Sequence, residues 1–263
     1  DGEQIISCGH DGVVALWPTS YPSAKLERNG GERIHTWIEF IPDTRKFLLA
    51  CSGGVIEQWD ADTGMREQSW NVHRFGVVGL AISADARWIA SCDVDSELIV
   101  MDRNDPKKRR NLTGHQGLIH QVRFHPNKPE IAACTRDRIY VWDVISGRLL
   151  RTLELPRDAH RLLYDGSGER MVIACRDFVV RVLDAQTGKV IDSEFQRHRS
   201  HVDDLAISRD GRYLASASRD RRILVHDLTT GERLHTLDHH TGPVSSVVFS
   251  PDGERLISTG VDG

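Results

Sequence analysis

Apolar residues in this chain occur in short runs that are separated by polar turn residues. Between residues 201 and 238 four such runs follow one another: HVDDLAIS, RYLASAS, RRILVHD and ERLHTLD. None of these runs has the i, i+3, i+4 spacing of apolar residues that is typical of an amphipathic helix. Short apolar runs bounded by turn residues predict β-strands, so this segment predicts four consecutive strands.

The four-strand pattern repeats along the chain. Five cysteines stand 43, 41, 42 and 41 residues apart, at Cys8, Cys51, Cys92, Cys134 and Cys175. A second series keeps nearly the same step, at Pro18, Asp60, Asp102, Asp143, Asp184 and Asp227. A period of about 40 to 45 residues with four strands in each unit predicts the blades of a β-propeller.

The segments between the runs have the composition of tight turns. Between the third and fourth runs of four units stand DADTG, DVISG, DAQTG and DLTTG. Asp accepts hydrogen bonds from the backbone of its own turn, and Gly adopts positive φ without steric cost. The recurrence of this pattern predicts a tight reversal at the same place in each unit.

The chain resembles the WD-repeat β-propeller family over all 263 residues. The resemblance rests on the dipeptides Trp59-Asp60 and Trp142-Asp143 and on the pair Gly114-His115. It implies an all-β fold of four-stranded antiparallel blades. It also implies that a buried hydrogen-bonded set of His, Ser or Thr, Asp and Trp braces a blade.

One unit contains all four members of this bracing set, as His115, Thr135, Asp137 and Trp142. The other units keep parts of it, with a histidine at His73, His198 and His240. Because an unpaired buried polar group destabilises a protein by roughly 1 to 3 kcal/mol, we expect apolar repacking where members are missing.

The repeat predicts five whole blades with a partial blade at each end, and 25 strands in all. A complete seven-bladed propeller has 28 strands and a six-bladed one has 24, at four strands a blade. We therefore expect residues 1–263 to form a single propeller domain that is truncated at both ends and is seven-bladed when complete. No linker-like segment divides it.

Composition excludes several classes of function. The formal net charge is −4, which gives no overall attraction to nucleic acid or to an anionic membrane. No apolar run approaches the roughly 18 residues of a membrane helix. The chain has no G-x-S-x-G, H-E-x-x-H or C-x-x-C motif, so the sequence predicts no enzyme activity, no cofactor and no metal site. The nearest approach to a metal cluster is LHTLDHH, where His240 already has the bracing position.

The cysteines are expected to occupy equivalent sites near the end of the second strand of each unit. Equivalent sites on stacked sheets lie about 10 Å apart, which is too far for a disulfide. We interpret the cysteines as small buried packing residues, and unpaired thiols in this number predict a cytoplasmic protein.

Charged residues recur in register at one edge of successive units. The residue before the tight-turn Asp is Arg136, Arg176 and Arg219, and the second position of the first strand holds His120, His160 and Asp203. The family resemblance implies that both positions lie on one rim of the propeller. Arginine binds carboxylate and phosphate in a bidentate manner, so these residues predict a site for an acidic or phosphorylated peptide. The alternative is that the arginines pair with neighbouring acids or with solvent.

Two further features have alternative interpretations. Trp37 stands where other units have Gly79, Gln121 or Ser246, and it either fills space left by missing bracing residues or anchors a ligand. The basic run 107–110 is expected on an exposed fourth strand, where charge discourages edge-to-edge association, or where it forms a docking patch.

Together these features predict a non-catalytic scaffold that binds partner proteins or peptides through its rim and loops. A second hypothesis makes the propeller the sensor or regulatory module of a larger protein, such as a kinase or a nucleotide-switch protein. A third makes it an enzyme that uses the central channel.

Overall fold

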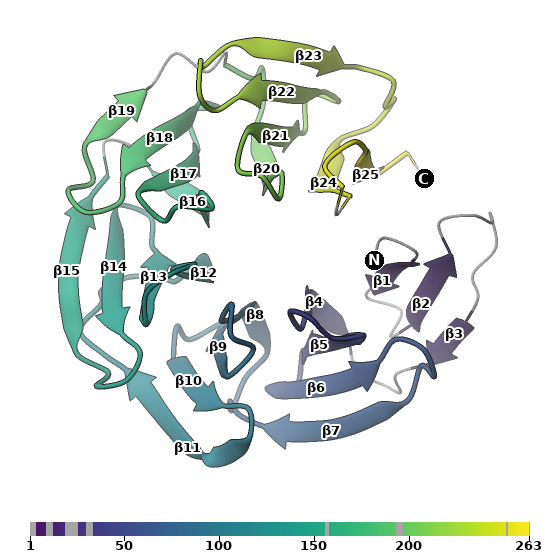
Figure 1. Cartoon of the computed structure of the whole chain (residues 1–263), viewed down its shortest axis with the longest axis vertical. Coiled ribbons are helices and arrows are strands. Elements are labelled where there is room, and N and C mark those ends of the chain that lie inside the picture. The colour runs from purple at the N-terminus through teal and green to yellow at the C-terminus, as the bar shows by residue number, and fades with distance from the viewer. Residues whose placement is uncertain are drawn as a thin grey trace. The chain divides into compact units, whose positions relative to one another are not determined.

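The computed structural model describes residues 4–8, 13–18, 26–29, 34–155, 158–192, 197–250 and 252–262. These ranges contain 25 strands and no helix (Figure 1). The fold is therefore all-β, and its four-stranded antiparallel sheets are the blades of a β-propeller, as the repeat predicted. The seven-blade count and the single domain over residues 1–263 stay predictions.

Within each sheet the strands lie side by side in chain order (Figure 1). The first sheet has three strands, β1 (Gln4–Cys8), β2 (Val13–Pro18) and β3 (Leu26–Asn29). Two complete blades follow: β4 (His35–Phe40), β5 (Lys46–Cys51), β6 (Val55–Asp60) and β7 (Arg66–Asn71), then β8 (Val77–Ile82), β9 (Trp88–Asp93), β10 (Leu98–Asp102) and β11 (Asp105–Leu112).

Three more complete blades and a strand pair complete the chain. The first two of these blades are β12 (Gln121–Phe124), β13 (Glu130–Cys134), β14 (Arg138–Asp143) and β15 (Leu149–Glu154), then β16 (Ala159–Tyr164), β17 (Arg170–Cys175), β18 (Val180–Asp184) and β19 (Val190–Asp192). The third blade and the pair are β20 (Val202–Ile207), β21 (Tyr213–Ser218), β22 (Ile223–Asp227) and β23 (Arg233–Leu237), then β24 (Val244–Phe249) and β25 (Leu256–Gly260).

The chain divides into two compact units. The first unit comprises Asp1–Phe124, Pro129–Ile131 and Trp142–Leu150, and the second comprises His125–Lys128, Ala132–Val141 and Arg151–Gly263.

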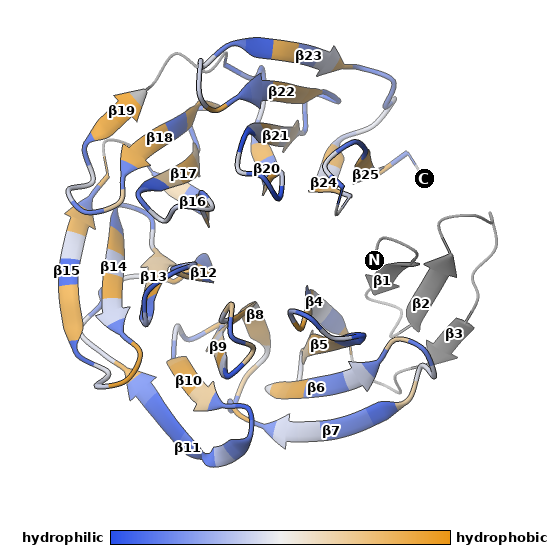
Figure 2. Cartoon of the chain, in the orientation of Figure 1, coloured by the Kyte–Doolittle hydropathy of each residue, from blue (hydrophilic) through white to orange (hydrophobic). Residues whose placement is uncertain are grey.

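In the first unit the β4–β7 and β8–β11 blades pack face to face. Their shared core contains Leu48 and Ile56 from one blade and Leu80, Ile89 and Met101 from the other. Second and third strands are the most deeply buried, and β10 is buried along its whole length. The fourth strand β11 is exposed over most of its length and hydrophilic (Figure 2), which agrees with the expected position of the basic run 107–110.

In the second unit the β20–β23 blade has two buried faces. Leu214 on β21 packs with Val172 and Val182 of the β16–β19 blade, whereas the next residue, Ala215, packs with Val244 and Val247 of β24. Successive side chains of a strand point to opposite faces, so one strand contributes to both cores.

The predicted turns between third and fourth strands are present. In DVISG, Oδ1 of Asp143 accepts the Ser146 N–H at 2.6 Å, and Gly147 has a φ of 74°. In DAQTG, Oδ1 of Asp184 accepts the Thr187 N–H at 2.7 Å, and Gly188 has a φ of 72°. Asp closes the turn and Gly allows the left-handed backbone that the reversal needs.

The cysteines do not occupy equivalent sites, so that prediction was wrong. Cys51 and Cys175 lie opposite the first residue of their neighbouring strands, His35 and Ala159, whereas Cys92 lies opposite the third residue, Gly79. Cys134 has the same position as Cys92. The backbone N–H of Thr135 donates to the carbonyl of Arg138 across the turn and so marks the end of the ladder, and Cys134 comes one residue before it. A shift of one residue moves a side chain to the other face of its sheet. The side chain of Cys8 lies outside the described residues.

The four described cysteines, Cys51, Cys92, Cys134 and Cys175, are buried and form no disulfide with one another. Burial raises the pKa of Cys92 to about 12. It raises the pKa of Cys175 to about 11, and it raises the pKa of Cys134 as well. Because the thiolate is the reactive form, these three thiols are inert in the folded protein at neutral pH.

We expect Cys92, Cys134 and Cys175 to resist an aromatic disulfide reagent at pH 7.5 in the native protein and to react in full after denaturation. Rapid labelling of any of the three in the native state, located by mass spectrometry, would contradict this expectation.

Candidate protein-binding site

The three arginines predicted at the rim, Arg136, Arg176 and Arg219, all lie in the second unit and are all exposed. We call them the turn arginines. Each follows the strand-end residue of a second strand, after Thr135, Cys175 and Ser218. The strand-end amides bond across the turn to carbonyls of Arg138, Val179 and Arg222, so the turns of Arg176 and Arg219 have the same length and the turn of Arg136 is one residue shorter.

Two of the turn arginines form ion pairs. Nε of Arg136 lies 2.6 Å from Oδ2 of Asp158, and Nε of Arg219 lies 2.8 Å from Oδ2 of Asp203. This matches the alternative interpretation for these two residues, pairing with neighbouring acids. The structure brings Arg219 together with Asp203, as the site prediction grouped them, and it adds Asp158. The sequence offered no signal for Asp158, because it lies outside both recurring positions.

Arg176 differs from the other two. Its side chain makes no ion pair within the described ranges, and its backbone N–H donates to the carbonyl of Asp158 at 2.7 Å. The carboxylate of Asp158 is paired with Arg136 instead. Arg176 is the turn arginine with a free charge.

The predicted histidines have other environments. Nε2 of His160 lies 2.6 Å from the carbonyl oxygen of Val202 on the next blade, and burial lowers the pKa of His160. In the first unit, the hydroxyl of Thr36 donates to the carbonyl of Val77 at 2.6 Å from the equivalent strand position. His160 thus links two blades as a neutral ring. His120 is half-buried and lies in the first unit.

The turn of Arg176 also carries an aromatic side chain that the sequence analysis missed. Phe178 has a φ of 69°, which is strained for a residue with a bulky side chain. Its ring lies 5.0 Å from that of His201, edge to face, and 5.9 Å from the guanidinium carbon of Arg197. Asp177 restrains this turn, because its two carboxylate oxygens accept hydrogen bonds from the guanidinium N–H groups of Arg181 at 2.9 and 2.6 Å.

A hydrogen-bonded His–Ser–Asp network fixes the turn that carries Arg219. Nε2 of His198 lies 2.8 Å from Oγ of Ser216, and Nδ1 lies 3.0 Å from Oδ2 of Asp220. The same arrangement occurs at His240, with Ser258 at 2.9 Å and Asp262 at 2.8 Å. His240, the last residue of LHTLDHH, therefore has a structural role.

The repeat pattern, the blades and these networks together point to one family. The family model described as "WD domain, G-beta repeat" matches residues 64–102, 106–143, 189–227 and 231–263, which is more than half of the chain. The chain belongs to the WD40 repeat family. Members of this family are generally scaffolds without catalytic activity.

Several curated proteins are similar to this WD40 chain. It is 24% identical over 233 residues to "Target of rapamycin complex subunit wat1" of Schizosaccharomyces pombe, covering 83% of this chain and 72% of that protein. It is 26% identical over 261 residues to "Nuclear distribution protein PAC1" of Coccidioides posadasii, covering 86% and 55%. It is 27% identical over 229 residues to "WD repeat-containing protein VIP3" of Arabidopsis thaliana, covering 86% and 62%. The chain spans less than two thirds of the length of the last two.

The predicted WD40 bracing set has mixed contacts. His115 and Trp142 lie edge to face with ring centroids 5.9 Å apart, and the indole N–H of Trp142 donates to the carbonyl of Thr113 at 2.8 Å. Thr135 donates to the carbonyl of Arg138 at 3.1 Å, and the side chain of Asp137 is 68% exposed.

Thr135 is a strand-end residue, at the position of Ser218. The serine of the observed network, Ser216, lies two residues earlier in its strand, where this blade has Ala133. An intact network occurs instead at His198, in a blade that has His226 at the Trp position, and a second one occurs at His240. The sequence analysis expected those blades to be incomplete.

Trp37 packs against the core of the first unit, as the space-filling interpretation predicted. The guanidinium carbon of Arg123 lies 5.5 Å from its ring centroid, and its indole N–H donates to Glu39 at 3.4 Å. In the basic run 107–110, Arg109 donates to the carbonyl of Asn71 at 3.2 Å. Among the described residues, no helix is long and apolar enough to cross a membrane.

The described residues include two groups whose side chains lie close enough to hold a metal ion. One is His35, Cys51 and Glu57, and the other is His73, Asp93 and Glu97. In the second group His73 already bonds to Ser91 at 2.8 Å, as the bracing histidines do. His73 is thus in a blade-bracing position, as His198 and His240 are.

The bracing network predicts how stability depends on pH. Burial lowers the pKa of His198 below its usual 6.5, so the unfolded chain binds a proton more readily than the folded one. The free energy of unfolding should therefore be highest above pH 6.5 and fall as the pH is lowered below 6.5. His198→Gln should flatten this fall and destabilise the protein by roughly 1 to 3 kcal/mol at pH 7.5.

Urea unfolding from pH 7.5 to 5 measures both effects. The matched control is His235→Gln, an exposed histidine on β23 of the same unit, which should leave the curve unchanged. A His198→Gln variant with the stability and pH dependence of the parent would show that the network does not brace the blade.

Proposed function

We propose that this WD40 chain is a non-catalytic interaction scaffold and that it binds acidic or phosphorylated segments of partner proteins at the turn arginines. The exposed guanidinium of Arg176, which forms no ion pair with any of the residues that the structure describes, is the observation that carries the proposal. Arg176 lies on a turn that the Asp177–Arg181 pair restrains, so the turn loses little conformational entropy when Arg176 binds a ligand.

The neighbouring ion pairs are compatible with binding. Exposed pairs such as Arg136–Asp158 stabilise a protein by only about 0 to 1 kcal/mol, so a carboxylate or phosphate of a partner can compete for the guanidinium. A phosphate has three acceptor oxygens and about two negative charges, which makes it the stronger competitor. Arg136 and Arg219 therefore become available when a ligand has bound Arg176.

Phe178 adds an apolar contact to this basic site. Its ring is half-buried and lies between His201 and Arg197, so one side chain of a peptide can pack beside it. Aromatic and arginine side chains are the residues most enriched among the dominant contacts of protein interfaces. An acidic or phosphorylated peptide with a neighbouring apolar residue fits this chemistry best. His160 and Asp203 are the supporting residues of the proposed site in the second unit, with His160 acting through the blade contact, whereas His120 belongs to the first unit and stays a prediction from the sequence.

A second proposal concerns the whole protein. The relatives PAC1 and VIP3 are longer than the segment that this chain matches. This supports a role of the chain as the sensor or regulatory module of a larger multidomain protein, such as a kinase or a nucleotide-switch protein. The relative wat1 is named as a subunit of a complex, which supports partner proteins as the ligand class. The free buried thiols favour a reducing compartment such as the cytoplasm.

The test uses Arg176→Glu and a matched control, Arg233→Glu, which reverses the charge of an exposed arginine on β23 of the same unit. Binding is measured by fluorescence anisotropy with three peptides of one sequence that carry serine, glutamate or phosphoserine at the central position. We expect the phosphoserine peptide to bind best and Arg176→Glu to weaken it by about tenfold or more, since a charged hydrogen bond contributes about 1.5 to 3 kcal/mol.

Arg233→Glu should bind like the parent. Equal affinity of the parent and Arg176→Glu, in protein with an unchanged circular dichroism spectrum, would remove the proposed site. Equal affinity for all three peptides would remove the acidic or phosphorylated ligand class.

A further inference from the structure

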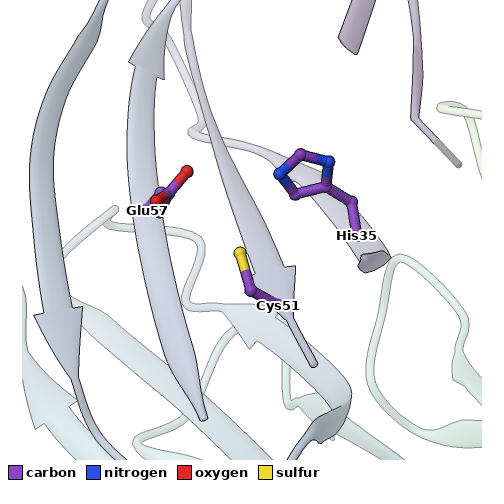
Figure 3. Close-up of side chains that lie close together, drawn as sticks. All are labelled: His35, Cys51 and Glu57. Carbon is purple, nitrogen blue, oxygen red and sulfur yellow. The ribbon is translucent and has the colours of Figure 1, made fainter. Parts of the chain in front are cut away.

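Three ligand-type side chains meet on one face of the β4–β7 blade, in the first unit and away from the proposed peptide site. His35 comes from β4, Cys51 from β5 and Glu57 from β6 (Figure 3). They are 2%, 0% and 0% exposed, respectively. One ligand atom from each lies within 4.8 Å of the others.

The strand register brings these residues together. His35 lies directly opposite Cys51, and Glu57 lies directly opposite Leu49, which is two residues before Cys51. Residues opposite one another, and residues two apart on a strand, share a face of the sheet. The backbone hydrogen bonds of the blade therefore place all three side chains before any ligand arrives.

Four other blades have an apolar residue at the position of His35, opposite the strand end: Val77, Ala159, Val202 and Val244. The position of Glu57 is Ile99 in the β8–β11 blade and Leu224 in the β20–β23 blade, whereas in the β16–β19 blade it is Arg181, which pairs with Asp177 at 2.6 Å. Aliphatic residues are thus enough for packing at both positions, and a buried carboxylate is unfavourable unless it is compensated.

The carboxylate of Glu57 is held in a fixed orientation. Oε1 accepts the Nη1–H of Arg66 at 2.8 Å, and Oε2 accepts the indole N–H of Trp59 at 3.0 Å. Each oxygen has two lone pairs, so each can still bind a cation. Metal-binding carboxylates in proteins are typically oriented by hydrogen bonds of this kind.

We propose that His35, Cys51 and Glu57 form a zinc site within this blade. An imidazole nitrogen, a sulfur and a carboxylate oxygen are all ligands of Zn²⁺, whereas Ca²⁺ and Mg²⁺ require oxygen ligands only. On binding, the Cys51 thiol releases its proton to the solvent, and the resulting thiolate and the Glu57 carboxylate balance the two positive charges of the metal. The sequence analysis predicted no metal site, because the three residues have no recognised spacing motif.

The second group of ligand-type residues is a weaker candidate. His73 takes part in the bracing contact with Ser91, and the side chain of Glu97 is 40% exposed. Glu97 also accepts the side-chain N–H of Asn111 at 3.0 Å. These contacts give His73 and Glu97 structural roles without a metal.

Cobalt substitution and zinc dialysis test the proposal. The protein is freed of metal with a chelator and then titrated with Co²⁺, and in a separate experiment it is dialysed against Zn²⁺ and analysed for bound metal. We expect one metal ion per chain and a thiolate-to-Co²⁺ charge-transfer band. Affinity should fall as the pH is lowered, because the thiol and imidazole must lose protons.

Three variants locate the site. Cys51→Ser and Glu57→Gln should abolish the thiolate band or weaken binding strongly. Arg66→Met should weaken binding by about 10- to 100-fold, the usual effect of removing a residue that orients a metal ligand. The matched control is Cys175→Ser, because Cys175 has the same strand-end position but lies opposite Ala159, and it should bind metal like the parent.

X-ray absorption of the zinc-loaded parent does not depend on the folding of any variant. It should show one sulfur and otherwise nitrogen or oxygen ligands. Coordination without sulfur, absence of the cobalt band in the folded parent, or loss of the band in Cys175→Ser would each overturn the proposal.

Discussion

A four-stranded sheet with two apolar faces cannot remain folded unless other sheets cover both faces, and the rest of this structure depends on that constraint. Leu214 and Ala215 are consecutive residues of β21, yet they belong to cores on opposite sides of their blade. Blades are thus stabilised by their neighbours more than by contacts within themselves, as in other repeat architectures. The exposed surface is left to the fourth strands and the turns, which are free to carry charge.

The buried faces also position the turns that carry function. Ser216 lies within the buried second strand, and His198 connects it to Asp220 in the turn that follows. Burial raises the pKa of Asp220, but the hydrogen bond from the Arg199 N–H and the nearby His198 outweigh this and lower it overall. Asp220 is therefore ionised and fixed. The exposed Arg219 next to it is presented by a rigid turn, although a surface arginine by itself is mobile.

Polar groups inside the blades are of two kinds. The bracing histidines hydrogen-bond to a serine and an acid within the same blade. These hydrogen bonds replace the ones with water that the buried groups lost on folding. His35 and Glu57 differ, because the β8–β11 and β20–β23 blades hold aliphatic residues at both positions, Val77 and Ile99 in one and Val202 and Leu224 in the other. A buried group that packing does not require is a stronger indication of ligand binding than an exposed one.

The sequence by itself determined the repeat, the strands and the turns. Spacings near 42 residues, the Asp and Gly of turns such as DVISG, and the short apolar runs are local features, and local hydrogen bonding and steric limits are enough to interpret them. The family followed from the same features. The location of the basic run on the exposed strand β11 was also predictable, because the order of strands in a blade follows the order of the chain.

Only the tertiary structure decided which residues face one another. Cys51 and Cys92 differ by one position in their strands, and this puts them on opposite faces, although their spacing of 41 residues differs little from the repeat. Loops absorb a residue without changing the period, but a strand cannot, because its side chains alternate. The Arg136–Asp158 pair and the meeting of His35 with Glu57 depend on such registers, so no spacing along the chain could reveal them.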